Sequence, residues 1–159
     1  LPICVTDLKQ RAKANDTGKF RTCIHFTDSD DVHEMLVAHT SFTYVRPHRH
    51  KIHGESLHVI EGEATVIIFD EDGKITRAHR IGDISSPFPF YYSIRNSSFH
   101  MLLIHSEYFI FKETTQGPFV RDHTIFPTWA PGHDNPSEIS KYIADLELRL
   151  EAFQSPGDI

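Results

Sequence analysis

The chain has 159 residues, of which 39% are hydrophobic and 24% are charged, and its formal net charge is -6. This length and composition are typical of one globular core, so we expect a single domain over residues 1–159. The acidic residues are dispersed, whereas a phosphate backbone requires a clustered basic face, and nucleic acid is therefore disfavoured as a partner. The sequence shows no apolar stretch of the roughly 20 residues that a membrane span requires, so no membrane association is expected.

The two cysteines, Cys4 and Cys23, are too few for the disulfide framework of a small secreted protein. Residues 1–15 mix charged and apolar side chains, without the continuous apolar block of a signal peptide. We therefore expect reduced thiols and a cytoplasmic location.

The N-terminal region, residues 1–38, is predicted to hold a short helix followed by lead-in strands. Leu8 and Ala12 lie four residues apart in polar surroundings between Val5 and Ala14, which is the spacing of one helix face. We expect this helix to lie on the surface of a larger body as a lid or a brace.

The central region, residues 39–131, has the pattern of many short strands. Gly-bearing turns at 61–63, 70–73 and 82–83 separate the strands, and the region shows no helical periodicity. This combination predicts a β-sandwich or a barrel. The expected strands are 42–45, 57–60, 64–69, 101–104 and 108–111.

The C-terminal region, residues 132–159, is predicted to be a linker and an amphipathic helix. Asn135 is the expected N-cap, Pro136 the first helical residue and Glu138 the partner in a capping box. The helix should end before Pro156 and present one apolar stripe. We expect this stripe to pack on the barrel of its own chain, with a partner subunit as the alternative. Its residues are Ile139, Ile143, Leu146, Leu150 and Phe153.

Histidine is unusually frequent, with 12 residues, and two of them suit metal binding best. In an extended chain His48 and His50 project to the same side, and a four-residue loop then brings Glu55 to the start of the next strand. His100, which begins another strand after a loop, is the predicted fourth ligand. Imidazole and carboxylate donors suit one divalent transition metal, such as Zn, Fe, Mn or Ni.

Other histidines are weaker candidates. His53 competes with Glu55, because His48, His50 and His53 form a three-histidine set if the loop curls back. His58 has the opposite strand parity from Glu55 and should face away. The remaining histidines lack partners at ligand spacing, and we expect them to be structural or solvated. They are His25, His33, His39, His79, His105, His123 and His133.

The metal-binding segment resembles a known motif. His48-x-His50, four residues, Glu55, six residues and Gly62 resemble the first cupin motif, and Gly82 with the loop that ends at His100 resembles the second. Phe42 stands where the first motif opens with glycine, and the second motif's Pro-x-Gly turn is replaced by 95–97.

Within the cupins, the chain is similar to the WbuC family over about residues 8–131. The similarity is carried by the runs 44–50 and 62–73, the turn 117–119 and the segment 129–131. The resemblance implies a mainly β fold, a double-stranded β-helix (jelly-roll) barrel, here with a short N-terminal helix and a C-terminal amphipathic helix. It also implies a metalloprotein associated with bacterial surface-polysaccharide gene clusters.

Tyr44 and Arg46 are candidate substrate-binding residues, because they share the strand face of His48. An arginine that faces a barrel interior is costly unless it meets an anionic group, which predicts a small, anionic ligand. The alternative is that Arg46 lies at the barrel mouth in water. Aromatic residues either line the ligand pocket or belong to the core; they are Phe88, Phe90, Tyr91, Tyr92 and Phe99.

Three functions are compatible with these residues. The first is a metal-dependent isomerase or epimerase acting on a small polar metabolite, and the resemblance implies a sugar or sugar derivative. The second is an Fe(II)-dependent dioxygenase, because two histidines and a carboxylate with open positions suit iron and oxygen. The third is a non-catalytic module that binds or senses a small molecule. An exposed sheet edge and the apolar C-terminal helix predict a homodimer.

Overall fold

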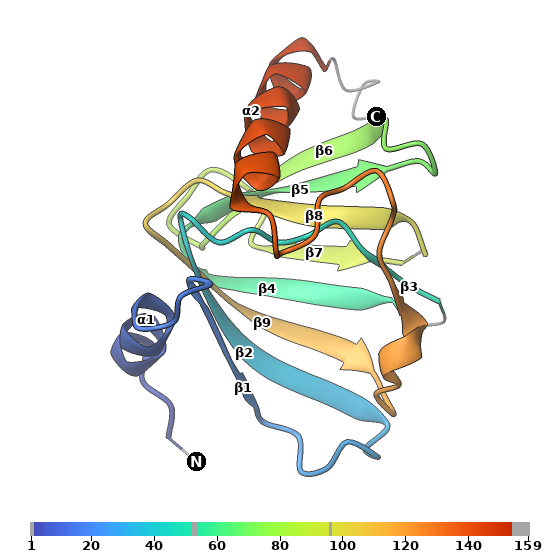
Figure 1. The fold of residues 1–159 in the computed structure, drawn as a ribbon. Coiled ribbons are helices and arrows are strands. Elements are labelled where there is room, and N and C mark those ends of the chain that lie inside the picture. Colours follow the sequence, from blue (N-terminus) through green and yellow to red (C-terminus); the bar gives the residue numbers. More distant parts are fainter. Residues whose placement is uncertain (1, 52–53, 96, 154–159) are drawn as a thin grey trace.

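The computed structural model describes residues 2–51, 54–95 and 97–153, and its strands form two facing antiparallel sheets with a short ribbon beside them (Figure 1). The larger sheet has the order β1 (Lys19–Cys23), β2 (Val32–Thr40), β9 (Tyr108–Gln116), β4 (Glu55–Glu61) and β7 (Tyr91–Ile94). The smaller sheet has the order β6 (Ile75–Gly82), β5 (Glu63–Phe69) and β8 (Phe99–Ile104). The ribbon pairs β3 (Arg49–His50) with β10 (Thr124–Ile125), which follows the short 3₁₀ helix Arg121–His123.

The main core lies between the two sheets. On β4 the inward residues Leu57 and Val59 flank the exposed His58, and on the paired strand β9 Phe109 and Phe111 also point inward. β5 is apolar along nearly its whole length because its second face is also buried, by the C-terminal helix. The predicted strands 57–60, 64–69, 101–104 and 108–111 are therefore confirmed within longer strands.

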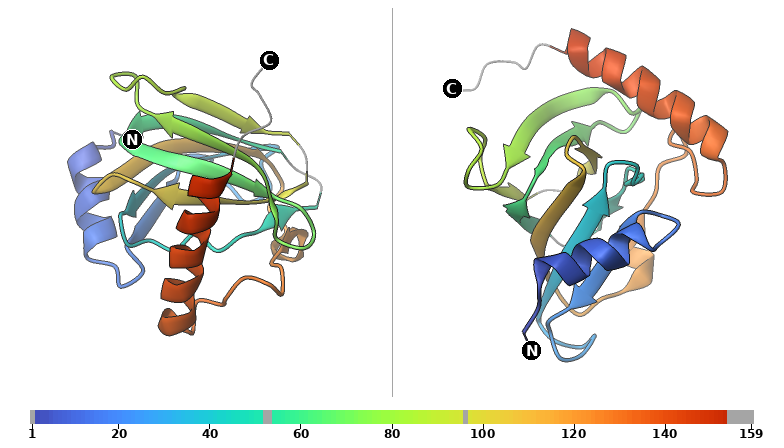
Figure 2. Two further views of the ribbon diagram at one scale, coloured as in Figure 1. Left: turned by 90° about the horizontal axis from the view of Figure 1, so that it is seen from above. Right: turned by 90° about the vertical axis from the view of Figure 1, so that its left-hand side faces the viewer.

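The C-terminal helix α2 (Pro136–Ala152) lies over the smaller sheet (Figures 1 and 2). The Asn135 side chain accepts a hydrogen bond from the Glu138 amide at 3.2 Å, which confirms the predicted cap. Leu146 is fully buried against the outward side chains of β5 and β8, and the predicted apolar stripe packs around it. The helix therefore packs on its own barrel.

The N-terminal helix α1 (Val5–Lys13) lies outside the larger sheet, near β1 and β2 (Figure 2). Its buried residues Leu8 and Ala12 pack against Ala38 and Ile110, which point outward from the sheet. This arrangement confirms a surface helix that braces the barrel. Among the described residues, neither helix combines the length and apolar composition needed to cross a bilayer.

The expected strand 42–45 is wrong. The chain makes a turn after β2 and then runs irregularly across the barrel. The physical reason is local hydrogen bonding: the Thr43 hydroxyl donates to the Gly18 carbonyl at 2.7 Å and accepts from the Thr40 amide at 3.1 Å. These bonds replace the ladder that a strand would form. The chain thus leaves the sheet and carries residues 44–48 over the interior.

Candidate metal centre

Three separate chain segments bring the four predicted metal-binding side chains together. His48 immediately precedes β3, His50 lies in β3, Glu55 begins β4 and His100 is the second residue of β8. His48 and His100 form an isolated antiparallel bridge, in which the His48 amide donates to the His100 carbonyl at 3.0 Å and the His100 amide donates back at 2.8 Å. This bridge ties the ribbon to the smaller sheet and fixes two imidazoles side by side.

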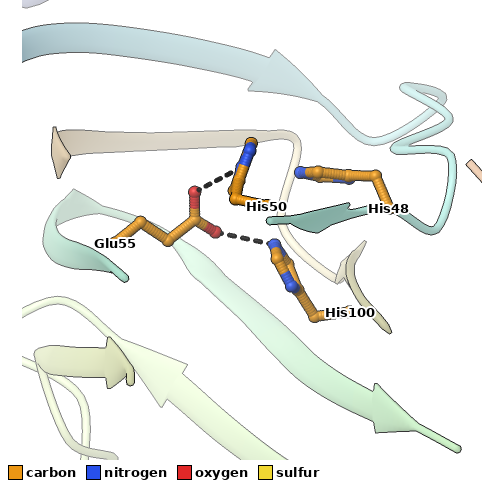
Figure 3. A group of neighbouring side chains, drawn as sticks. All are labelled: His48, His50, Glu55 and His100. Atoms are coloured by element: carbon orange, nitrogen blue, oxygen red, sulfur yellow. Dashed lines mark ion pairs between the residues drawn. The ribbon is translucent and has the colours of Figure 1, made fainter. Parts of the chain in front are cut away.

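The donor atoms of the four side chains converge. One nitrogen or oxygen from each residue lies within 4.8 Å of the other three (Figure 3). Glu55 Oε1 is 2.8 Å from His100 Nε2, and Glu55 Oε2 is 3.4 Å from His50 Nε2. The His48 ring centroid lies 4.5 Å from that of His100 and 5.2 Å from that of His50. The sequence-predicted set is thus one cluster.

Backbone carbonyls set the tautomers of two rings. His48 Nδ1 lies 2.9 Å from the Arg46 carbonyl, and His100 Nδ1 lies 3.0 Å from the Ser98 carbonyl. A carbonyl only accepts, so each Nδ1 carries the hydrogen and each Nε2 is left with its lone pair. Carbonyl contacts of this kind orient metal-binding imidazoles in proteins.

The Glu55–His100 contact favours a cation. His100 Nε2 is buried and lacks an aligned hydrogen bond within the described structure, although Glu55 Oε1 approaches it to 2.8 Å. A neutral His100 would place its lone pair against a carboxylate oxygen, and the two acceptors would repel each other. Either a proton on His100 or a metal ion shared by both residues removes this repulsion.

Electrostatics keep most of the donors in their metal-binding form. Burial opposes ionisation of Glu55, but His100 and His50 outweigh it and hold the pKa of the Glu55 carboxyl well below its usual range. Burial, followed by the positive charge of His100, lowers the pKa of His48 to about 4. Burial also disfavours a proton on His100, but the charge of Glu55 raises the pKa of His100 overall. His100 is therefore the ring on which a proton competes with a metal.

The donor set fits a divalent transition metal. Three imidazole nitrogens and one carboxylate oxygen suit zinc, iron, manganese or nickel. All four residues also line a cavity of about 640 Å³ between the larger sheet and the segments that cross it. This volume is in the range of small-molecule sites, so the cavity is large enough to hold a ligand beside the cluster.

Tyr44 and Arg46 line the same cavity, but their polar ends are engaged. The Tyr44 hydroxyl donates to the Pro131 carbonyl at 3.1 Å, and Arg46 Nη2 lies 3.3 and 3.4 Å from the carbonyls of Pro127 and Ala130. The two side chains thus hold the linker before α2 as a cavity wall. Arg46 Nε is buried without a hydrogen-bond partner in the described part of the chain. Contact of either residue with a substrate stays a prediction.

Glu113 is a cavity residue that the sequence interpretation missed. It lies on β9, opposite Leu57 on β4 and Met35 on β2, and therefore faces the interior among apolar neighbours. Burial, followed by the negative charge of Glu55, raises the pKa of Glu113 to about 8. The signal was its strand parity, because Phe109 and Phe111 on the same strand also face inward.

The remaining candidates divide between cavity, exterior and core. His53 lies outside the described residues, and His58 is exposed on β4, as its parity predicted. Phe99 belongs to the core beneath α2, and the aromatic side chains of 88–92 do not line this cavity. Several of the histidines that we expected to be structural or solvated line the cavity; they are His25, His33, His39, His123 and His133.

Comparison with known proteins supports the fold. A family model described as "Domain of unknown function (DUF6016)" matches residues 4–81. No curated protein matches the chain. Protein SO0799 from Shewanella oneidensis aligns with a TM-score of 0.60 at 10% identity, over 77% of this chain and 83% of that one.

Two further solved structures agree. DMSP lyase DddQ from Ruegeria pomeroyi DSS-3 aligns with a TM-score of 0.53 at 16% identity, over 72% of this chain and 54% of that one. KdgF from Halomonas sp. aligns with a TM-score of 0.50 at 15% identity, over 65% of this chain and 82% of that one. These structural neighbours are cupin-fold proteins, and the chain described here has the cupin fold. At such identities the comparison establishes the fold alone.

Proposed function

We propose that this chain is a metal-dependent enzyme that acts on a small, polar, anionic metabolite by isomerase- or epimerase-type proton transfer. The observation that carries the proposal is the convergence of His48, His50, Glu55 and His100 at the wall of a cavity large enough for such a ligand. The resemblance to the WbuC family supports a sugar or sugar derivative in surface-polysaccharide metabolism as the substrate class. A cytoplasmic homodimer is part of the same proposal.

A divalent metal held by the four side chains would supply a Lewis acid that polarises a carbonyl oxygen of the metabolite. The chain itself supplies orientation. His48 and His100 are locked by backbone carbonyls, so their Nε2 atoms stay aimed at the cluster. Leu57 and Phe111 line the adjoining wall and limit the access of water.

Glu113 is the proposed site of proton exchange. Its carboxyl group faces the cavity two residue pairs away from the Glu55–Thr115 pair of β4 and β9. The described residues offer it neither a hydrogen bond nor an ion pair, so it is free to contact a ligand. A carboxyl with a pKa of about 8 can both donate and accept a proton near neutral pH.

The test is solvent hydrogen exchange. Metal-loaded protein in D₂O is incubated with aldoses, ketoses and sugar acids, and NMR follows deuterium at carbons next to a carbonyl. We expect exchange with at least one substrate that depends on metal and is lost in His50→Ala. Tight binding without turnover on any candidate would instead favour a non-catalytic module. Oxygen consumption by the iron-loaded protein would favour a dioxygenase, which the same donor set also suits.

A further inference from the structure

The end of the cavity beside β1 is lined by cationic side chains. Lys19 and Arg21 lie two residues apart on this edge strand and both line the cavity. Phe20, between them, packs on the opposite face of the sheet with the residues beneath α1. Lys19 is half-buried, whereas Arg21 stands exposed at the rim.

These two cations form no ion pair among the described residues, although Arg21 lies near enough to Glu113 for its charge to oppose the rise that burial causes in the pKa of that carboxyl. Among the described residues, no carboxylate lies within ion-pair distance of Lys19 or Arg21, and neither side chain makes a hydrogen bond. Burial, followed by the positive charge of Arg21, lowers the pKa of Lys19. Arg46, by contrast, already donates to linker carbonyls. An anion between Lys19 and Arg21 would relieve their mutual repulsion.

Two imidazoles complete this end of the cavity. His39 faces Lys19 across the β1–β2 pair, is 7% exposed, and has a buried Nδ1 without a hydrogen-bond partner in the described structure. Burial, followed by the charge of Lys19, lowers the pKa of His39 to about 4, so the ring is neutral and one nitrogen can donate. His133 lies close enough to Lys19 and Arg46 that both charges, after burial, lower its pKa. A buried polar nitrogen normally has a partner, which points to a ligand here.

The backbone conformation of Gly18 fixes the position at which Lys19 begins β1. Gly18 has φ +68°, and a Cβ at this position would lie 2.2 Å from the Thr40 hydroxyl oxygen. The Gly18 carbonyl accepts hydrogen bonds from the Thr43 hydroxyl at 2.7 Å and from the Thr40 amide at 2.8 Å. Lys19 therefore starts from a fixed corner, unlike an ordinary surface lysine.

This cationic end lies far from the metal centre. On β9, Phe109 pairs with His39 and Thr115 pairs with Glu55. Six residues of an antiparallel strand span about 20 Å, so the two groups lie toward opposite ends of one cavity.

We propose that Lys19, Arg21 and His39 form an anion-binding subsite for a phosphate or carboxylate group, separate from the metal centre. A ligand that fills both ends is therefore elongated and carries its acidic group remote from the part that meets the metal. The inference that one ligand fills both ends rests on the proposed function, whereas the anion-binding subsite does not.

The test uses metal-free protein, so that no anion binds through a metal. ¹⁵N-labelled protein is titrated with inorganic phosphate, and separately with acetate, at constant ionic strength, while the amides of residues 18–21 and 39 are followed by NMR. We expect saturable shifts. Lys19→Met should weaken binding by about tenfold or more, since hydrogen bonds to charged groups are among the strongest. The matched control Lys13→Met, at the exposed end of α1, should bind as the wild type does.

The remaining variants separate the two proposals. His50→Ala should keep anion binding. If the wild-type protein binds phosphate but no metal, the proposed function is contradicted and the anion subsite is not. If Lys19→Met does not fold by circular dichroism, Arg21→Met takes its place. Saturation by phosphate alone assigns a phosphorylated ligand, saturation by acetate alone assigns a carboxylate, and saturation by both supports a subsite that accepts either group. Unsaturable shifts with both anions, or unchanged binding in a folded Lys19→Met or Arg21→Met variant, would overturn the subsite.

Discussion

The two ends of the cavity differ in how the charges of their side chains are balanced. At the metal end, the Glu55 carboxylate faces three imidazoles, so acid and base partly neutralise each other even without a bound ion. At the other end, Lys19 and Arg21 have no acid within ion-pair distance among the described residues. The four converging side chains at the metal end are therefore preorganised by their own chain, whereas the proposed subsite at the cationic end requires a ligand to complete it. Changes at the two ends should therefore have different signatures.

The largest expected effect is loss of metal from the metal end. His50→Ala removes one of four converging donors and should lower the metal content from about one equivalent to nearly none, while the barrel stays folded. The matched control is His58→Ala, because His58 is exposed on β4. Elemental analysis of both purified variants is the measurement. Undiminished metal in His50→Ala would remove this residue from the site.

A smaller effect is expected for Glu113, which lies between the two ends. Glu113→Gln keeps the shape of the side chain but cannot exchange a proton, so solvent exchange into the substrate should fall about 10²-fold or more. Metal content should stay unchanged, since Glu113 is outside the converging set. The exposed Glu107→Gln serves as control. Full exchange activity in Glu113→Gln would exclude this residue as the proton-transfer group.

The pH dependence of metal affinity should report on His100. The charge of Glu55 raises the pKa of His100, so a proton occupies the ring in the metal-free protein at higher pH than it would in an unperturbed histidine. Below that pKa, metal affinity should fall about tenfold per pH unit, because one proton is displaced for each metal bound. Competitive titration with a chromophoric chelator measures the slope of metal affinity against pH. The titration runs from about pH 5 to about pH 8, which is roughly the range in which histidine titrates. A flat profile would mean that His100 is not a ligand.

The smallest effect is on the stability of the metal-free protein, and it involves both ends. Burial is the leading reason why the pKa values of His48 and His39 are each lowered to about 4, whereas in the unfolded chain the pKa of each histidine lies near its ordinary value of 6.5. The unfolded state thus takes up more protons in this window, and the free energy of unfolding should decrease as the pH falls from 6.5 toward 4.

His39→Gln should reduce this pH dependence through the cationic end alone, while His48→Gln should reduce it through the metal end. Urea unfolding at several pH values compares the two. An unaltered slope in both variants would show that neither buried imidazole is kept neutral by the fold.

The sequence predicted the metal end because three of its four candidate ligands lie close together in the chain. Strand periodicity predicts that His48 and His50 point to the same side, and a four-residue loop brings Glu55 to the start of the next strand. His100 begins a recognisable apolar strand. The same periodicity predicted the central strands. It missed β6, an edge strand in which Thr76, Arg77 and Arg80 are exposed and which therefore lacks a strong apolar pattern.

The cationic end could not be predicted in the same way. Lys19 meets His39 through the register of β1 and β2, and Glu113 meets Leu57 through the register of β9 and β4. Register between segments that are distant in the sequence is set by packing, which a local pattern does not contain. Arg46 shows the same limit, because its carbonyl partners lie more than 80 residues away.

The most direct test of the metal centre is crystallographic. Crystals grown with zinc, manganese, iron or nickel would be measured at the absorption edge of each metal. We expect one anomalous peak about 2.0 to 2.2 Å from the Nε2 atoms of His48, His50 and His100 and from a Glu55 oxygen. A peak elsewhere, or no peak beside these residues with any of the four metals, would contradict the account.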